Sequence, residues 1–187
     1  MGRLLVEEDI KQYNLFLSGD VSGFENLVLK YKNQLIYFVM QYVKEFHMAE
    51  DMAQDAFVEI YVHKERFNRK QSFKTYLFTI ARNKAIDYIR KYNREMPYDI
   101  NEIMNEEYYE LENCVIKKEE QTLVRNTILS LKEDYKLAIL LIDFYNMSYE
   151  EAAKVLGKTM AQMKILIFRA RKSLGKQLLK EGYGYEK

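Results

Sequence analysis

Residues 147–174 read MSYEEAAKVLGKTMAQMKILIFRARKSL and predict two helices joined by a tight turn. Ser148 and the glutamate three residues after it have the spacing of a capping box, which marks the start of a helix. Gly157 suits the left-handed conformation in which many helices end. Thr159 and Gln162 repeat the capping-box spacing, so a second helix is expected to begin there. This order of elements is typical of a helix-turn-helix unit.

The second predicted helix has the pattern of a helix that enters the major groove of DNA. Its apolar residues recur at steps of four, three and four and form the expected inward face: Met163, Ile167, Ala170 and Leu174. The residues at its start are expected at base edges: Thr159, Met160, Ala161, Gln162 and Lys164. The basic residues further along the helix are suited to contacts with DNA phosphates: Arg169, Arg171, Lys172 and Lys176. The alternative is a plain helical hairpin whose basic helix serves only solubility.

Residues 73–91, FKTYLFTIARNKAIDYIRK, predict a longer helix with one buried face and one solvated face. The buried positions are expected to be Leu77, Ala81, Ala85 and Tyr88. The solvated positions are expected to be Asn83, Asp87, Arg90 and Arg94. The basic stretch 66–73 leads into Phe73 and Tyr76, and this combination suits a single nucleic-acid strand. Two alternatives stay open: both rings can belong to the core, and Asp87 can pair with Arg90 or Lys91 along the helix.

Residues 49–63, AEDMAQDAFVEIYVH, predict a third helix whose outer face is half acidic and half apolar. Its inward stripe is expected to be Met52, Ala56 and Ile60. A different face carries Asp51, Asp55, Val58 and Val62 at steps of four, three and four. Exposed valines beside carboxylates suit the docking of a basic protein helix. The alternative is an ordinary solvated surface.

The composition limits both the fold and the chemistry. A chain of 187 residues allows one medium domain or two small ones, and seven Gly with one Pro are too few for the turns of a sandwich or barrel. We therefore expect an all-α fold. Cys114, His47 and His63 lack the spacing of a metal site, so no metal or cofactor is expected. No stretch resembles a signal peptide or a membrane span, so a cytoplasmic location without direct membrane insertion is expected.

The formal net charge of +1 hides a segregation of charges along the chain. Residues 61–95 hold ten bases and three acids, and residues 158–187 hold eight bases and two acids. Residues 96–121 lie between them with two bases and eight acids. Two separate basic regions are suited to two contacts with a polyanion, and such binding weakens steeply with salt.

The charge pattern coincides with a division into domains. Helical periodicity begins near Phe24, with Leu27, Tyr31, Leu35, Phe38 and Tyr42 at steps of three or four. Residues 96–121 contain the only proline and little periodicity, so they are expected to form an acidic linker. A second, smaller core is expected from Leu123, Ile128, Leu131, Leu137, Leu140 and Leu141. We therefore predict domains at 1–95 and 122–187.

The three segments, in this order and separation, resemble bacterial RNA polymerase sigma factors. The resemblance is to the compact extracytoplasmic-function (ECF) group, which keeps only the second and fourth sigma regions, and it covers roughly residues 20–95 and 122–180. AEDMAQDAF is similar to the helix that grips the coiled-coil clamp of polymerase. FKTYLFTIARNKAIDYIRK is similar to the segment that melts and reads the minus-ten element. Residues 147–174 are similar to the region that reads the minus-thirty-five element.

The resemblance implies a role for each set of residues. The first domain would be region 2 and the second a region 4 helix-turn-helix. Polymerase would be bound by Asp51, Gln54, Asp55, Phe57, Val58 and Val62. A base flipped out of the non-template strand would be captured by a loop of Asn68, Arg69, Lys70, Gln71, Ser72, Phe73 and Lys74, supported by Tyr76. Adjoining DNA would be held by Arg82, Asn83 and Arg90. The implied partners are core RNA polymerase, duplex and single-stranded promoter DNA, and an anti-sigma factor.

The sequence also departs from the family pattern. Leu131-Lys132 replaces a common Leu-Pro, and Tyr76 replaces a frequent Trp. In the recognition helix, Ala-Gln-Met-Lys-Ile-Leu at 161–166 replaces a frequent Gly-Thr-Val-Lys-Ser-Arg. The missing Arg at Leu166 removes one phosphate contact. Ile165 beside it indicates altered minus-thirty-five specificity or an extra apolar contact.

The sequence alone also admits other classes of function. An enzyme is disfavoured because the sequence offers no nucleophile-base pair, no Gly-rich phosphate loop and no carboxylate pair placed with a His. An autonomous helix-turn-helix regulator would need no melting loop. A helical adaptor would bind acidic proteins through its basic regions. A divergent sigma factor governing toxin genes would also fit the altered recognition helix.

Overall fold

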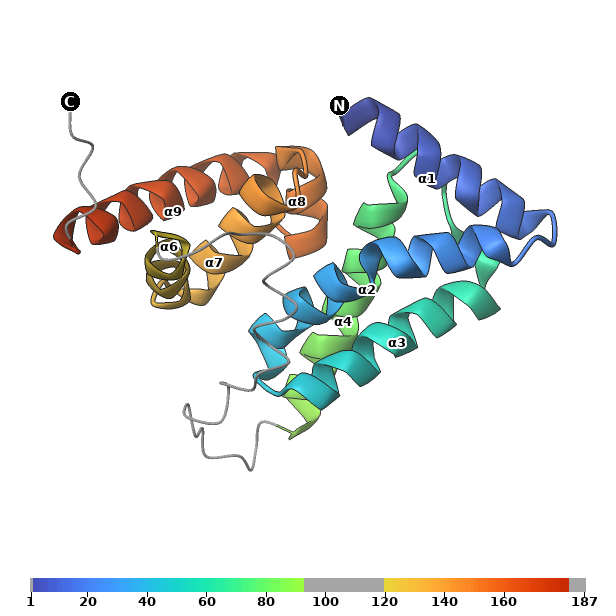
Figure 1. Cartoon of the computed structure of the whole chain (residues 1–187), viewed down its shortest axis with the longest axis horizontal. Helices are drawn as coiled ribbons and strands as arrows, with labels where there is room; N and C mark the ends of the chain where they lie inside the picture. The colour runs from blue at the N-terminus through green and yellow to red at the C-terminus, as the bar shows by residue number, and fades with distance from the viewer. Residues whose placement is uncertain (1, 93–119, 182–187) are drawn as a thin grey trace. The chain divides into compact units, whose positions relative to one another are not determined.

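The computed structural model describes residues 2–92 and 120–181, and the regular elements within these ranges are helices (Figure 1). The predicted all-α class is therefore confirmed. The chain divides into two compact units, the first built mainly from its N-terminal half, with Lys154–Leu156 grouped with it, and the second mainly from its C-terminal half. Most of the predicted linker at 96–121, with Cys114, lies outside the described residues, so its predicted boundaries stay a prediction. Within the described residues, no helix is long and apolar enough to span a bilayer.

Within residues 2–92, the first unit is a bundle of four α-helices. They are α1 (Gly2–Leu17), α2 (Ser22–Val43), α3 (Phe46–Val62) and α4 (Phe73–Tyr92), with the short 3-10 helix η1 (Lys64–Arg66) after α3. Helix α2 is central, because it contacts α1, α3 and α4. Its predicted inward residues are buried: Leu27, Tyr31, Leu35 and Phe38.

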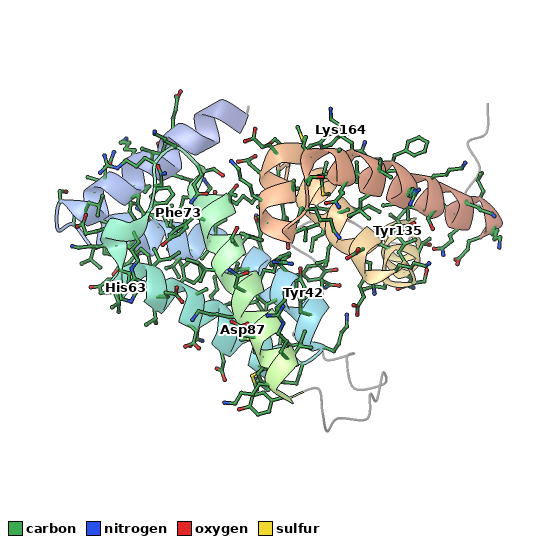
Figure 2. The ribbon with its side chains drawn as sticks, turned by 180° about the vertical axis from the view of Figure 1, so that it is seen from behind. Tyr42, His63, Phe73, Asp87, Tyr135 and Lys164 are labelled. Atoms are coloured by element: carbon green, nitrogen blue, oxygen red, sulfur yellow. The ribbon has the colours of Figure 1, made fainter. Side chains whose placement is uncertain are left out.

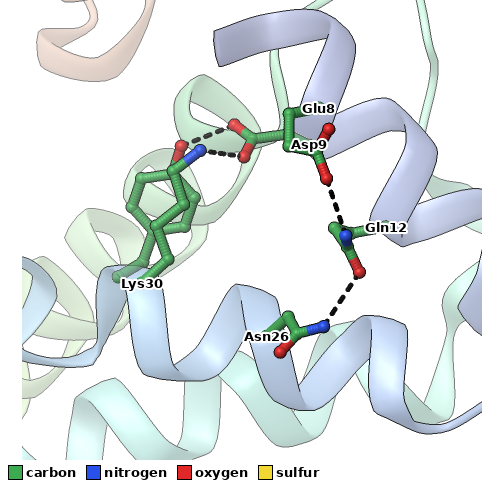
Figure 3. A network of polar contacts seen from close by, with 6 residues as sticks. Glu8, Asp9, Gln12, Asn26 and Lys30 are labelled. Atoms are coloured by element: carbon green, nitrogen blue, oxygen red, sulfur yellow. Dashed lines mark hydrogen bonds and ion pairs between the residues drawn. The ribbon is translucent and has the colours of Figure 1, made fainter.

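Helix α1 is joined to α2 by a buried polar contact that the sequence pattern did not predict. Asp9 is buried, and its carboxylate accepts hydrogen bonds from the Lys30 ammonium and the Tyr31 hydroxyl (Figure 3). Beside it, Gln12 Nε2 donates to Glu8 at 2.7 Å, and Gln12 Oε1 accepts from Asn26 at 3.1 Å. A buried carboxylate costs free energy unless it is paired and hydrogen-bonded, and the pairing here ties the two helices in one register.

The second unit contains the predicted helix-turn-helix. Its elements within residues 120–181 are α6 (Glu120–Leu129), α7 (Glu133–Ile139), the π-helix η3 (Leu140–Phe144), α8 (Tyr149–Leu156) and α9 (Met160–Lys180). Helix α9 packs on α6 and α7. The π-helix has the wider hydrogen bonding that is rare in proteins and was not predicted.

Both predicted capping boxes are present. At the start of α8, Ser148 N donates to Glu151 at 2.9 Å, and Glu151 N donates to Ser148 Oγ at 3.2 Å. At the start of α9, Thr159 N donates to the Gln162 side chain at 2.8 Å, and Gln162 N donates to Thr159 Oγ1 at 3.2 Å. Gly157 lies between them with a φ of 63°, the left-handed value expected for this turn.

Candidate nucleic-acid and protein interfaces

Helix α3 presents the predicted mixed stripe to solvent. Asp51 and Asp55 are exposed, and Val58 and Val62 expose 57% and 64% of their surface. Gln54 is exposed beside them. The opposite face is buried through Met52, Ala56 and Ile60, as the spacing predicted. We refer to Asp51, Asp55, Val58 and Val62 as the docking stripe.

The structure corrects one member of the predicted polymerase-binding set. Phe57 is buried, and its ring lies edge-on to Phe24 of α2 with 6.2 Å between ring centroids. A side chain that fills the core cannot also present its surface to a partner. Phe57 therefore supports the docking stripe from beneath. Lys84 of α4 pairs with Glu59 at 2.8 Å, which ties α4 to the same helix.

The loop between η1 and α4 has a shape set by its own polar side chains. Asn68 Oδ1 accepts a hydrogen bond from the Lys70 backbone amide at 3.0 Å, an Asx-turn contact. The Gln71 amide donates to the Asn68 carbonyl at 3.1 Å. Asn68, Arg69 and Lys70 are all exposed. The loop therefore holds two basic side chains, those of Arg69 and Lys70, at the surface, although it does not belong to a helix itself.

Ser72 and Phe73 take structural roles, which corrects the predicted direct contacts of both residues with DNA. Ser72 is buried, and its Oγ accepts a hydrogen bond from the Thr75 amide at 3.2 Å, next to the first turn of α4. Phe73 exposes 0% of its surface and lies at the start of α4 among the helices of the first unit (Figure 2). A base cannot stack on a ring that is covered on every side.

Phe73 belongs to a cluster of rings beneath the loop, which we call the aromatic floor. Its other members are Tyr13, Tyr31, Phe67 and Tyr76. The Phe73 centroid lies 5.5 Å from that of Tyr13, 6.0 Å from that of Tyr31 and 5.9 Å from that of Phe67. Tyr76 packs on Phe67 at 5.3 Å and is half-buried, so part of its ring stays at the surface.

Helix α1 contributes Tyr13 to the aromatic floor, and the sequence pattern did not predict this role. Its hydroxyl donates to the Lys64 carbonyl at 2.7 Å, so α1 holds the segment that leads into the loop. Burial is the main cause that raises the pKa of Tyr13, and Tyr76 and Glu65 add to it. The available signal was the spacing of Asp9, Tyr13 and Phe16, which places them on one helical face.

The outward face of α4 carries the residues predicted to hold adjoining DNA. Asn83 and Arg90 are exposed and Arg82 is half-buried. Arg90 Nη1 lies 3.8 Å from Asp87, one of the two partners predicted for that carboxylate. Both side chains are largely exposed, so the pair contributes little to stability. Lys74 lies with its ammonium 5.7 Å from the centroid of the Tyr31 ring.

The start of α9 presents its predicted base-contacting residues to solvent. Thr159, Met160, Ala161, Gln162 and Lys164 are all exposed. Lys164 points away from α6 and α7 (Figure 2). Thr159 and Gln162 also form the capping box, so their side chains are oriented by the backbone. The inward residues Met163, Ile167 and Ala170 are buried and Leu174 is half-buried.

The structure gives Arg171 a partner inside its own unit. Its guanidinium forms two hydrogen bonds with the Asp143 carboxylate of η3. The hydrogen bond to Asp143 is the main cause that raises the pKa of Arg171. Arg171 therefore fastens α9 to η3, and its expected contact with a phosphate stays a prediction. Arg169 and Lys172 are exposed.

Comparisons with known proteins match both units of the chain. The family model described as Sigma-70 region 2 matches residues 27–95, and the model described as Sigma-70, region 4 matches residues 121–174. The ECF RNA polymerase sigma factor SigW of Bacillus subtilis is 30% identical over 186 residues, covering 94% of this chain and 97% of the relative. The chain belongs to the ECF group of RNA polymerase sigma factors.

The family resemblance inferred from the sequence is thus confirmed. The RNA polymerase sigma-H factor of Pseudomonas aeruginosa is 29% identical over 185 residues, which cover 94% of this chain and 96% of that protein. A solved structure of sigma factor RpoE with the anti-sigma factor NepR, from Bartonella quintana, has a similar fold, with a TM-score of 0.61 and 24% identity. It covers 83% of this ECF sigma factor and 96% of the solved chain. Members of this family are transcription initiation factors.

Proposed function

We propose that this ECF sigma factor binds core RNA polymerase through the docking stripe and directs it to promoters through two DNA surfaces. The docking stripe carries the proposal, because exposed valines framed by carboxylates suit a contact with a basic protein helix, whereas the carboxylates would repel DNA. A basic helix of a partner would bury Val58 and Val62 while its cations approach Asp51 and Asp55. Gln54 lies beside this contact.

The minus-ten surface is proposed to be the loop at 68–71 above the aromatic floor. Extruding a base from a duplex costs a few kcal/mol, which contacts with the extruded base must offset. The exposed Arg69 and Lys70 would neutralise the strand, and the open part of Tyr76 would meet a base. Arg82, Asn83 and Arg90 on α4 would hold the adjoining backbone.

The minus-thirty-five surface is proposed to be the start of α9. Met160, Ala161, Gln162 and Lys164 would face base edges, and Arg169 and Lys172 would contact phosphates. The domain limits at 1–95 and 122–187 follow from these assignments. The chain would act in the cytoplasm, where polymerase and promoters are found, without inserting into a membrane.

We also propose that an anti-sigma factor controls this chain. The solved sigma factor RpoE, which shares its fold, was crystallised with the anti-sigma factor NepR. An inhibitor of that class would cover the docking stripe or one of the DNA surfaces. Either position would prevent the chain from joining polymerase at a promoter.

The test is reconstitution with core polymerase, followed by sequencing of transcript starts. Val58→Glu should abolish co-elution with core polymerase, because it places a charge in the apolar centre of the contact. The matched control is Leu29→Glu on α2, since Leu29 is also an exposed aliphatic residue but lies outside the stripe. Tight binding of the isolated chain to an operator duplex, with transcription unaffected by Val58→Glu, would favour the autonomous regulator instead.

A further inference from the structure

Helix α9 has an apolar face on the side opposite its buried face. The buried residues Met163, Ile167 and Ala170 pack on the second unit. Ile165 and Phe168 nevertheless expose 53% and 66% of their surface. At about 100° per residue, Ala161, Ile165 and Phe168 fall within one sector that faces away from the core. This sector is where a recognition helix meets a groove.

The charges around this face favour DNA over a protein as its occupant. Lys164 lies on one side of the face and Arg169 on the other, and Lys172 lies within it. All three side chains are exposed. Residues 158–187 hold eight bases against two acids. An apolar strip between rows of cations matches a groove floor between rows of phosphates.

The chemistry of the apolar side chains limits which bases they recognise. Guanine is read by donors such as Arg, and adenine by the amide of Asn or Gln. Ile165 and Phe168 have no donor or acceptor. The thymine 5-methyl is the apolar group that unmodified base pairs present in the major groove, so thymine is the base that such side chains favour.

We propose that this face reads thymine methyl groups in the minus-thirty-five element, with Ile165 and Phe168 as its specificity-determining residues. This inference rests on the proposed function. Ala161 supports it because a small side chain near the start of the helix lets the backbone approach the bases closely. The step from Ala161 to Phe168 spans about 10 Å along the helix. At about 3.4 Å per base pair, the face covers three successive pairs.

A fourth exposed apolar residue of α9 serves as a control. Leu179 is exposed but lies fourteen residues beyond Ile165, a distance of about 21 Å along the helix. The major groove is only about 12 Å wide, so Leu179 lies outside base contact. Leu179→Ala removes the same number of carbon atoms as Ile165→Ala, at a position outside the proposed base-reading face.

The experiment uses holoenzyme assembled from core polymerase and the full chain. Randomised upstream duplexes selected by this holoenzyme should contain thymine within three consecutive base pairs. Replacing each such thymine by uracil removes only the methyl group, and should weaken binding about fourfold per contacted base. With Ile165→Ala or Phe168→Ala, one uracil replacement should lose its effect. Leu179→Ala should keep the wild-type response.

Three outcomes would count against the proposal in different ways. Normal promoter-specific transcription that ignores every thymine methyl would overturn this inference alone. Unchanged DNA selection by Ile165→Ala and Phe168→Ala, with weaker binding to core polymerase in the absence of DNA, would show a protein-docking face instead. The absence of any promoter-dependent transcription with unmodified DNA would overturn the proposed function and this inference together.

Discussion

Tyr13 connects a helix outside the matched region 2 model to the loop proposed to capture a base. The match to the Sigma-70 region 2 family begins at residue 27, whereas Tyr13 belongs to α1, which precedes it. Its ring supports Phe67 and Phe73, and its hydroxyl donates to the Lys64 carbonyl. A buried hydroxyl that loses its proton would place an anion against the acceptor oxygen of that carbonyl. The contact therefore requires the neutral phenol.

We predict that Tyr13→Phe makes stability less sensitive to alkaline pH. The folded state raises the pKa of Tyr13 above its usual value of 10.0, mainly through burial. Above about pH 10 the unfolded chain loses this proton first, so the free energy of unfolding falls as pH rises. Urea unfolding between pH 8 and 11 should show a shallower decline for the variant. At neutral pH the variant should lose about 1 kcal/mol with the hydrogen bond.

The half-exposed Tyr61 provides a control for this measurement. Tyr61→Phe also removes one phenol hydroxyl from the same bundle but leaves the contact between Tyr13 and the Lys64 carbonyl intact, so it serves as the matched Tyr→Phe substitution. An identical alkaline slope for Tyr13→Phe and the wild type would contradict the assignment. The slope, and not the absolute stability, is the decisive quantity.

Residue by residue, the sequence predicts which face of a helix is buried but not what the buried side chain touches. Val58 and Val62 were expected on an outer face, and they lie there. Phe57 and Phe73 were expected at interfaces, yet both are buried. Their burial depends on rings contributed by α1 and α2, and no local spacing encodes those partners.

At the scale of elements, the packing of α1 on α2 depends on a glycine. A Cβ placed on Gly23 would lie 2.2 Å from the Gln12 carbonyl oxygen and 2.9 Å from Leu15 Cβ. Both distances are below van der Waals contact, and the first involves backbone that cannot move aside cheaply. Gly23 therefore sets how closely α1 approaches α2, and with it the position of Asp9 and Tyr13.

We predict opposite effects for the same substitution at two helical glycines. Gly23→Ala should destabilise the first unit by about 2 kcal/mol, because overpacking outweighs the better helix propensity of alanine. Gly175→Ala in α9 should stabilise the second unit by about 0.5–1 kcal/mol, since its Cβ would meet nothing within 4 Å. Denaturant unfolding of the full chain checks both signs. Equal effects at the two sites would contradict the close packing.

The elements that the sequence predicted well are those defined by local chemistry. Both capping boxes and the turn at Gly157 depend on residues within a few positions of one another, and all are present. The π-helix η3 and the tie between Arg171 and Asp143 were not foreseen. The tie joins residues 28 positions apart, and the spacing of apolar residues within one helix does not encode so distant a pair.

For the whole molecule, the proposed function assigns promoter opening to the first unit and promoter location to the second. The first unit holds the docking stripe and the loop over the aromatic floor. The second holds the recognition helix with its own core. Each proposed DNA surface is supported by contacts within its own unit, such as Asn68 with Lys70 and Thr159 with Gln162. A variant with a defect at one surface should therefore respond differently to a change of DNA template from a variant with a defect at the other surface.

We predict that a promoter opened in advance by mismatches across the minus-ten element rescues one variant and not another. Asn68→Ala removes the side chain that shapes the capture loop, so it should reduce transcription from duplex DNA about tenfold, by weakening the contacts that offset base extrusion. The mismatched template needs no extrusion and should restore most of this activity. Lys164→Ala should stay impaired on both templates, because the upstream duplex is the same in each. Run-off transcription at limiting holoenzyme measures both variants on both templates. Rescue of Lys164→Ala by the mismatched template would contradict the division of labour. Equal defects of Asn68→Ala on the two templates would also contradict it.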